Sequence, residues 1–355
     1  MSSKNHFLLA SGYAEADQPG LHGFYLLADS GALVPNGSWA GIAKPGFLAS
    51  HPQGGVYAAS ETNGGAVVAL RLGMRPGEVR VLGQQPSGGD APCHLVFDPT
   101  GAWLAVANYS SGTARLIPRL PDGSLGEPGP ITRHSGHGPN PERQDGPHAH
   151  ATIFSPDGRF AIVADLGLDR LMIYMPDRTT GELLAHGEGV AHPGAGPRHM
   201  VWHPDGRLLY VANELDATVS SFAFDPQAGT LAEREQLTTL PPGNHHKQVA
   251  DIQIDAAGAR LYVSNRGHNS VAVFALAPDG ALSPLAIRPC GGDWPRNLAL
   301  SPDGQFLLVA NQHSGELAVL PILPGPDALG EPVARAAVPG AACVRFMPEG
   351  HGWVL

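Results

Sequence analysis

Residues 199–213, HMVWHPDGRLLYVAN, consist of two apolar stretches joined by a Pro-Asp-Gly turn. Pro and Gly suit a tight turn, and the aliphatic and aromatic residues on both sides favour short strands. Related turns recur along the chain and contain, in order, Pro52, Pro99, Pro156, Pro204, Ala256, Pro302 and Pro348. The intervals between them are 47, 57, 48, 52, 46 and 46 residues. The chain is therefore built from a repeat of about 50 residues.

Each turn lies between two short apolar stretches, and a third stretch follows, such as TVSSFAF, SVAVFAL or ELAVLPI. Three strands and a variable fourth at this interval are typical of a β-propeller blade. The seven turns predict an all-β fold, a seven-bladed β-propeller that occupies residues 1–355 as one domain. The last turn lies close to the C-terminus, so HFLLASGY and LHGFYLLAD near the N-terminus are expected to complete the last blade and close the ring.

Composition restricts the partners that we expect. The 355 residues are 43% hydrophobic and 15% charged, which is enough for a large core. A net charge of −10 without any Lys/Arg-rich run argues against nucleic acid. The three cysteines lie far apart and suggest a reducing compartment. No segment resembles a signal peptide or approaches the roughly 18 apolar residues of a membrane span. We expect a cytoplasmic protein, a monomer or a weak homo-oligomer, with neither a membrane nor a nucleic-acid partner.

Alignment of the repeats on their turns separates a uniform position from two variable ones. Nine residues after the turn, each repeat carries a carboxylate or an amide: Glu61, Asn108, Asp165, Asn213, Asn265 and Asn311. Such uniformity predicts a structural role, because a short polar side chain can bond nearby backbone where one strand turns into the next.

The next position is variable and contains Thr62, Tyr109, Leu166, Glu214, Arg266 and Gln312. Six residues before the turn, where each innermost strand is expected to begin, the repeats carry Gly46, Cys93, His150, Arg198, Ala250, Arg296 and Ala342. Antiparallel pairing places the start of one strand and the end of the next on the same rim. Both variable positions are therefore expected to surround one mouth of the central channel, as a site that faces an asymmetric ligand would.

The longest interval contains an insertion, RHSGHGPNPERQDGPHAH at residues 133–150. It brings six polar residues to the same mouth: His134, His137, Asn140, Glu142, Arg143 and His148. Functional residues concentrate on loops that a rigid scaffold supports. The insertion is therefore a candidate lid or wall of the site.

Histidines gather in RHSGHG, PHAH and GNHHK, but the chain has neither an HExxH motif nor a Cys/His zinc spacing. It also lacks a GxSxG nucleophile motif and a phosphate-binding loop in the required strand-to-helix context. We therefore expect no metal and no cofactor, and we interpret these histidines as hydrogen-bonding loop residues.

Several stretches carry a family resemblance: GPNPERQDGPHAHATIFSPDGRFAIVADLGLDR, GPRHMVWHPDGRLLYVANELDATVSSF, LYVSNRGHNSVAVF and WPRNLALSPDGQFLLVANQ. They resemble the seven-bladed lactonase family, which includes bacterial propeller-type 6-phosphogluconolactonases and the fungal 3-carboxy-cis,cis-muconate lactonizing enzyme. The resemblance covers nearly the whole chain and is strongest from about residue 90 to residue 312.

The resemblance implies a catalytic set without a metal, consisting of a His, two Arg and a Glu. By motif these correspond to His148 of GPHAH, Arg198 of GPRH, Glu214 of NEL and, less directly, Arg266 of SNRGH. The alignment of the repeats independently assigns all four to one rim. We expect His148 to act as general base or acid, with Glu214 as its partner or as the alternative base. Arg198 and Arg266 would stabilise the oxyanion and bind an anionic substrate.

The remaining candidates are expected to bind substrate. Arg143 and Arg296 would contact phosphate or carboxylate, whereas Asn140, His150 and Gln312 would bond sugar hydroxyls. The leading hypothesis is hydrolysis of a sugar δ-lactone, 6-phosphoglucono-1,5-lactone before others. The same site could instead lactonize a carboxylated muconate or open another aldonolactone. A non-catalytic propeller that binds a protein partner is a further alternative, because fold alone does not fix function.

Overall fold

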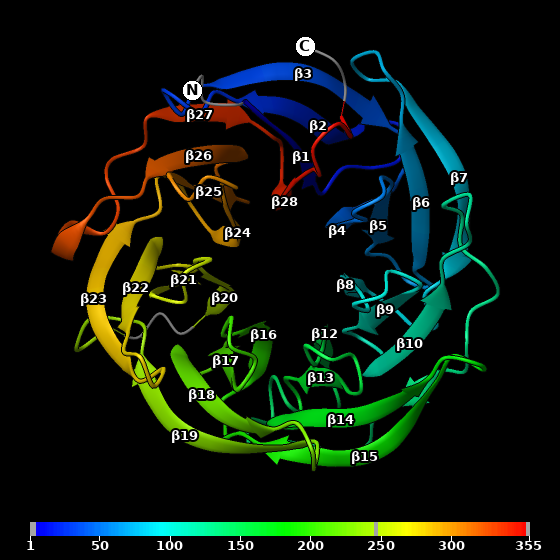
Figure 1. Cartoon of the computed structure of the whole chain (residues 1–355), viewed down its shortest axis with the longest axis vertical. Helices are drawn as coiled ribbons and strands as arrows, with labels where there is room; N and C mark the ends of the chain where they lie inside the picture. Colours follow the sequence, from blue (N-terminus) through cyan, green and yellow to red (C-terminus); the bar gives the residue numbers. More distant parts are fainter. Residues whose placement is uncertain (1–4, 245–247, 353–355) are drawn as a thin grey trace.

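The computed structural model describes residues 5–244 and 248–352. In these residues, seven four-stranded sheets surround a central axis, and each sheet extends outward from it like a blade (Figure 1). The all-β, seven-bladed propeller predicted from the repeat is confirmed. Within the same residues, no helix is both long enough and apolar enough to cross a membrane.

Each blade has an innermost, a second, a third and an outermost strand. The innermost strands, which define blades 1 to 7, are β4 (Pro45–Ser50), β8 (Pro92–Phe97), β12 (Ala149–Phe154), β16 (Pro197–Trp202), β20 (Val249–Ile254), β24 (Pro295–Leu300) and β28 (Ala341–Phe346). The second strands are β5 (Val56–Ser60), β9 (Trp103–Asn108), β13 (Ala161–Asp165), β17 (Leu208–Asn213), β21 (Arg260–Asn265), β25 (Phe306–Asn311) and β1 (His6–Gly12).

The third strands are β6 (Ala66–Leu72), β10 (Thr113–Pro118), β14 (Arg170–Asp177), β18 (Thr218–Asp225), β22 (Ser270–Leu276), β26 (Glu316–Pro321) and β2 (Pro19–Leu26). The outermost strands are β7 (Val79–Pro86), β11 (Thr132–Arg133), β15 (Glu182–Val190), β19 (Thr230–Thr238), β23 (Leu282–Pro289), β27 (Ala334–Ala337) and β3 (Leu33–Ala40). A short 3-10 helix, η1 (Gly325–Asp327), precedes β27.

The sequence of each strand matches its distance from the axis. Every residue of β17 and of β25 is buried, because both faces of these strands pack against neighbouring blades, and both sequences are correspondingly apolar. The outermost strand β19 instead has mostly exposed residues, with one buried and two half-buried residues between them. Period-two alternation of this kind is expected for a strand with one face toward water. Apolar clusters lie between adjacent blades and hold the ring rigid.

The two ends of the chain meet in blade 7. Strand β28, from the C-terminal end, pairs antiparallel with β1, and Leu8 faces Phe346 in that pairing. The sheet continues through β2 to β3, so three N-terminal strands and one C-terminal strand form a single blade (Figure 1). The register places Gly12 opposite Ala341, as Asn108 is opposite Pro92 in blade 2. Residue 13 therefore occupies the variable position of blade 7.

Blade 1 departs from the register that a fixed offset predicts. Ser50 pairs with Val56, whereas the equivalent Phe97 of blade 2 pairs with Leu104, so the first hairpin is one residue shorter. Two glycines at positive φ, Gly54 at 87° and Gly55 at 102°, allow the tighter turn. The assignment of Glu61 to the uniform structural position and of Thr62 to the variable one is therefore wrong.

The paired strands give the corrected register. Ser60 lies opposite Pro45, as Asn108 lies opposite Pro92, so Ser60 occupies the structural position of blade 1. Glu61 consequently belongs to the variable ring, beside the residues of the candidate site. Asn108 of blade 2 has the predicted role, since its side-chain nitrogen donates to the carbonyl of Ser87 at 3.1 Å.

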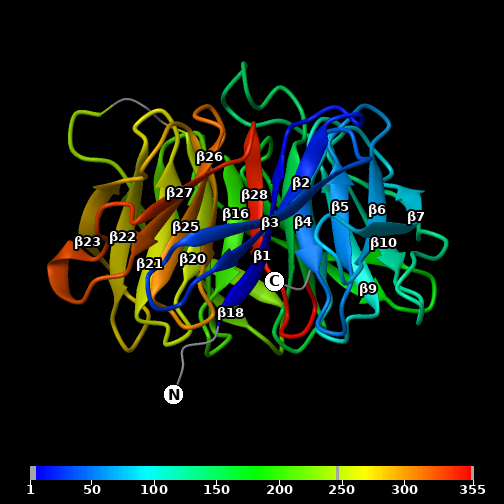
Figure 2. The ribbon, with the colours of Figure 1, turned by 90° about the horizontal axis from the view of Figure 1, so that it is seen from above.

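The insertion that precedes β12 forms the tallest loop over one rim of the ring (Figure 2). The Pro-Asp-Gly turns lie at the opposite rim, between the innermost and second strands. All innermost strands begin, and all second strands end, on the side of the insertion, as the antiparallel pairing requires. We call this side the insertion mouth of the channel.

Candidate functional site

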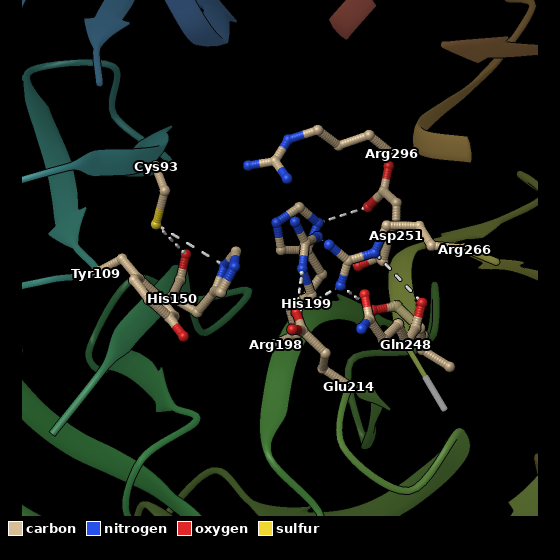
Figure 3. A network of polar contacts seen from close by, with 12 residues as sticks. Cys93, Tyr109, His150, Arg198, His199, Glu214, Gln248, Asp251, Arg266 and Arg296 are labelled. Atoms are coloured by element: carbon tan, nitrogen blue, oxygen red, sulfur yellow. Dashed lines mark hydrogen bonds and ion pairs between the residues drawn. The ribbon is translucent and has the colours of Figure 1, made fainter. Parts of the chain in front are cut away.

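Glu214 lies at the insertion mouth, directly after β17, and three arginines from different elements bind its carboxylate. Arg198 of β16 donates from Nε to Oε2 at 3.0 Å. Arg266, directly after β21, lies with one guanidinium nitrogen 2.7 Å from the same oxygen. Arg143 of the insertion donates to Oε1 at 2.6 Å. The structure thus brings together Arg198, Glu214 and Arg266 (Figure 3). The predicted binding residue Arg143 joins them through its contact with Glu214.

The charges of this cluster control its protonation. Burial alone would raise the pKa of Glu214, but the positive charges of Arg266, Arg198 and Arg143 lower it to about 2. Burial, together with the nearby charges of Arg266 and Arg296, lowers the pKa of Arg198 to about 10. At neutral pH the carboxylate is therefore ionised, and the positive charge of the three arginines is larger than its single negative charge.

Hydrogen bonds to backbone carbonyls fix the positions of two of these arginines. Arg198, with a side chain only 2% exposed, donates to the carbonyl of Ala250 at 2.5 Å. Arg266 donates to the carbonyls of Gln248 and Val249, and its guanidinium lies 5.5 Å from the centre of the Trp294 ring. Because their positions are fixed before any ligand arrives, these cations meet the requirement for electrostatic stabilisation of a transition state.

His148 lies at the end of the insertion, just before β12. Its ring stacks on Tyr109 at a centroid distance of 4.6 Å and an interplanar angle of 13°. Its Nδ1 lies 3.1 Å from the carbonyl oxygen of Tyr109, and because a carbonyl only accepts, Nδ1 carries the proton of the neutral ring. Nε2 then holds the free lone pair and lies 3.7 Å from the exposed carboxylate of Asp145. The imidazole thus presents a possible base to the mouth.

Tyr109 connects His148 to the glutamate cluster. It directly follows β9, and its hydroxyl lies 3.2 Å from the Arg143 nitrogen that also binds Glu214. His148, Tyr109, Arg143 and Glu214 therefore form a continuous chain of contacts from blade 3 to blade 4.

Buried side chains hold the insertion in place. Gln144, which is fully buried, donates to the carbonyl of Leu166 at 2.8 Å and to the carboxylate of Asp169 at 2.7 Å. Asp165 accepts the backbone N–H of His148 at 2.8 Å and contacts the ring of His134 at 2.5 Å. One carboxylate thus binds both ends of the insertion. The insertion is therefore a fixed wall of the site, and His134 helps to attach it to blade 3 through Asp165.

The other predicted binding residues have different surroundings. His150 of β12 packs edge-on against Tyr109 and His199, and burial and nearby arginine charges hold its pKa well below the usual value, so it is neutral. The side-chain oxygen of Asn140 accepts the backbone N–H groups of Glu142 and Arg143 and shapes the loop. The side-chain oxygen of Gln312 is buried and accepts no hydrogen bond within the described residues.

The opposite side of the insertion mouth contains a second cluster, to which Arg296 of β24 belongs. Tyr13, after β1, donates its hydroxyl to Glu61 at 2.6 Å, and Glu61 lies 3.6 Å from the Arg296 guanidinium. Burial raises the pKa of Tyr13, so its hydroxyl keeps its proton. The alignment missed Tyr13 because its blade is split between the chain ends, and it missed Glu61 because of the shorter first hairpin. The strand pairings are the signal that identifies both.

A polar layer lies below the arginines in the channel. Asp251 of β20 accepts from His199 Nδ1 at 2.7 Å and from Asn297 Nδ2 at 2.6 Å, and Asn297 accepts the backbone N–H of Val344 at 2.9 Å. Burial and the charge of Arg198 lower the pKa of His199 to about 4. These contacts join the innermost strands of blades 4 to 7, which share no backbone ladder, and they form the floor of the site.

Two cavities open on the far side of this layer. One has a volume of about 380 Å³ and is lined by residues that include His94, His199 and Arg345. The other, of about 660 Å³, lies between the turns of blades 1 and 2 beside Phe47 and Arg345. Both lie toward the mouth opposite the insertion.

Metal-ligating side chains do not gather at either mouth in the part of the chain that the structure describes. Residues 5–244 and 248–352 hold no group of three or more His, Cys, Asp or Glu side chains arranged to bind a metal ion. His245 and His246 of the GNHHK motif lie outside the described residues. The chemistry available at the insertion mouth comes from the arginines, the Glu214 carboxylate and the imidazole of His148. Such a set can bind an anion and stabilise negative charge that develops on a carbonyl oxygen.

Comparison with known proteins identifies the family of the chain. Residues 7–346 match the family described as "Lactonase, 7-bladed beta-propeller". The chain is 31% identical over 341 residues to the 6-phosphogluconolactonase of Bacillus subtilis (strain 168), and the match covers 95% of this chain and 97% of that protein. It is 33% identical over 285 residues to the 6-phosphogluconolactonase of Pectobacterium carotovorum subsp. carotovorum (strain PC1), with coverages of 76% and 81%.

A solved structure shows the same architecture. The periplasmic gluconolactonase PpgL of Pseudomonas aeruginosa superimposes with a TM-score of 0.91 at 28% identity, over 97% of this chain and 99% of that one. Its sheets therefore follow the same course over nearly the full length. The chain belongs to the seven-bladed β-propeller lactonase family and is a lactonase of the 6-phosphogluconolactonase type.

Proposed function

We propose that the cluster around Glu214 opens a sugar δ-lactone to the free acid, with 6-phosphoglucono-1,5-lactone as the leading candidate substrate. One observation carries the proposal: three arginines surround a single glutamate, and Tyr109 connects this cluster to His148. The surplus of positive charge suits a carbonyl that becomes an oxyanion. It also suits a substrate that carries a phosphate.

His148 acts as the general base in this proposal. Its Nε2 takes a proton from water as the water oxygen attacks the lactone carbonyl. The tetrahedral intermediate then collapses, the bond from the carbonyl carbon to the ring oxygen breaks, and the ring oxygen leaves with the proton that His148 returns. The product is the open hydroxy acid.

The arginines stabilise the oxyanion. Arg198 and Arg266 carry the charge that faces the carbonyl oxygen, and Arg143 binds the anionic end of the substrate. The low pKa of Glu214 disfavours it as a base, because a carboxylate held by three arginines is a weak proton acceptor. Glu214 instead orients the three guanidinium groups.

Two alternatives keep the same site. The relation to a gluconolactonase favours activity on unphosphorylated aldonolactones as a second candidate. Lactonization of a carboxylated muconate would use the arginines to bind carboxylates. The scaffold that only binds a protein partner is set aside because curated relatives carry enzyme names. The cytoplasmic location expected from the sequence stays a prediction.

The test is turnover of freshly prepared lactones by the wild type and by two variants. His148→Ala is expected to lower kcat by roughly 100-fold or more, as loss of a general base does. Arg198→Ala should lower kcat/KM by a similar factor through loss of oxyanion stabilisation. Unchanged rates in both variants would contradict the proposed site. His137→Ala, at an exposed position on the same insertion, is the matched control and should leave the rate unchanged.

The proposed mechanism uses no metal. Dialysis of the wild type against a chelator is therefore expected to leave turnover unchanged. A loss of activity that a divalent cation restores would contradict this part of the proposal.

A further inference from the structure

The insertion mouth has two halves of different charge. In the half formed by blades 2 to 5, where the proposed reaction takes place, three arginines and one glutamate leave a surplus of positive charge. In the half formed by blades 6, 7 and 1, Arg296 is balanced by Glu61, and Tyr13 lies with them. The proposed chemical steps use none of these three residues.

The three side chains are held as a unit. The guanidinium carbon of Arg296 lies 5.2 Å from the centre of the Tyr13 ring, and the hydroxyl of Tyr13 donates to Glu61 at 2.6 Å. Each residue comes from a different blade, so closure of the ring brings them together. The guanidinium of Arg296 extends into the channel (Figure 3).

Gly46 leaves room for Glu61. A Cβ at this position would clash with Oε2 of Glu61, so a larger residue here would force the Glu61 side chain to move. The equivalent positions in blades 2 to 4 carry Cys93, His150 and Arg198. The missing side chain in blade 1 therefore gives the Glu61 carboxylate its place at the mouth.

Arg296 has free hydrogen-bonding capacity. Within the described residues it makes an ion pair and a ring contact but no hydrogen bond, whereas Arg143, Arg198 and Arg266 each donate at least two. The side chains of Arg296 and Glu61 are 17% and 18% exposed. Guanidinium donors and a carboxylate acceptor thus lie side by side within reach of a ligand.

The donors of Arg296 and the acceptor of Glu61 indicate which chemical group of a ligand binds here. A hydroxyl both donates and accepts, so two neighbouring hydroxyls match an arginine beside a glutamate. A phosphate at the same place would meet the negative charge of Glu61. We propose that Tyr13, Glu61 and Arg296 form the subsite for the hydroxyls of the sugar lactone, an inference that rests on the proposed function. Arg296 is then a hydroxyl contact in place of the phosphate contact expected from the sequence.

The test compares three lactones: 6-phosphoglucono-1,5-lactone, glucono-1,5-lactone and δ-valerolactone, whose ring has no hydroxyls. Glu61→Gln and Arg296→Gln should lower kcat/KM for both sugar lactones by roughly 10- to 100-fold, the effect of losing a charged hydrogen bond. Turnover of δ-valerolactone by each variant should stay within about 2-fold of the wild-type value, because that ring makes no such bond. If the wild type does not open δ-valerolactone, this also agrees with a requirement for hydroxyls. In that case, equal losses of kcat/KM on the two sugar lactones support the hydroxyl subsite, and a loss on the phosphorylated lactone alone contradicts it.

Further variants separate positioning from folding. Gly46→Ala should displace Glu61 and reproduce the loss seen in Glu61→Gln. Tyr13→Phe, which keeps the ring below Arg296, should cause a smaller loss of roughly 5-fold. Glu182→Gln and Arg207→Gln, at exposed positions outside the site, are the matched controls and should behave as the wild type.

Three results would overturn the inference. The first is a loss confined to the phosphorylated lactone, which would make Arg296 a phosphate contact. The second is an equal loss on δ-valerolactone, and the third is no loss in any variant. A wild type that opens none of the lactones would instead refute the proposed function itself.

Discussion

Two glutamates at one mouth have opposite surroundings. Three arginines hydrogen-bond or pair with Glu214, which is almost fully buried, whereas Glu61 accepts from a tyrosine and lies beside a single arginine. The difference follows from the residues that each blade contributes to the same two ring positions. Glu214 is therefore an organiser of fixed cations, and Glu61 keeps an oxygen available to a ligand.

The Glu214 cluster predicts how stability depends on pH. The pKa of Glu214 is about 2 in the folded chain and about 4.3 in an unfolded one, so its ionisation stabilises the fold fully above about pH 4.3. This stabilisation is lost as the pH falls through about 2. Glu214→Gln should lower the free energy of unfolding by about 3–5 kcal/mol at neutral pH, because it leaves buried arginines unpaired.

Urea unfolding over a pH series measures this effect. The difference between wild type and Glu214→Gln should be largest above about pH 5 and should shrink toward pH 2. Glu142→Gln, at an exposed position, should follow the wild type at every pH. A difference between Glu214→Gln and wild type that does not change with pH would contradict the ionised state assigned to Glu214.

At the scale of elements, hairpin length decided which site residues could be predicted. Residues at a constant offset from the turn, such as Arg198 and Glu214, were placed correctly on one rim because blades 2 to 6 share one register. Glu61 was misplaced because two positive-φ glycines shorten the first hairpin by one residue. Side-chain contacts such as Arg143 with Glu214 join residues far apart in sequence, and no spacing rule contains them.

The insertion gives a prediction about an element. Gln144 joins it to blade 3 by hydrogen bonds to Leu166 and Asp169, so Gln144→Ala leaves buried polar groups unpaired. Residues 134–148 should then exchange amide hydrogens faster than in the wild type. KM for the lactone should rise because Arg143 is no longer held against Glu214. Hydrogen exchange measured by mass spectrometry, with His137→Ala as the control, checks the first effect.

Unchanged exchange in Gln144→Ala together with a raised KM would contradict the anchoring role, since substrate binding would then depend on Gln144 by another route. Unchanged exchange and unchanged KM would show that other contacts, such as those of Asp165, hold the wall alone.

At the scale of the whole molecule, the repeat was sufficient to predict the fold. Seven turns at near-constant intervals identified seven blades, because each blade must present the same apolar strands to its neighbours. The repeat did not reveal the polar layer of Asp251 and Asn297, which ties separate blades together below the site. Such ties depend on how blades rotate around the axis, which the sequence of a single repeat does not determine.

The ring has two mouths, and we propose that catalysis takes place at the one that carries the insertion. The opposite side has cavities of about 660 and 380 Å³, the first of them beside Phe47 and Arg345. Charge and hydrogen bonding favour the insertion mouth, where fixed arginines surround a buried carboxylate.

The most direct test is a crystal structure of the protein with 6-phosphogluconate, the product of the proposed reaction. We predict that the product carboxylate lies between His148 and Arg198, with the sugar hydroxyls toward Arg296 and Glu61. A product bound in the cavity beside Phe47 and Arg345, with the insertion mouth empty, would contradict it.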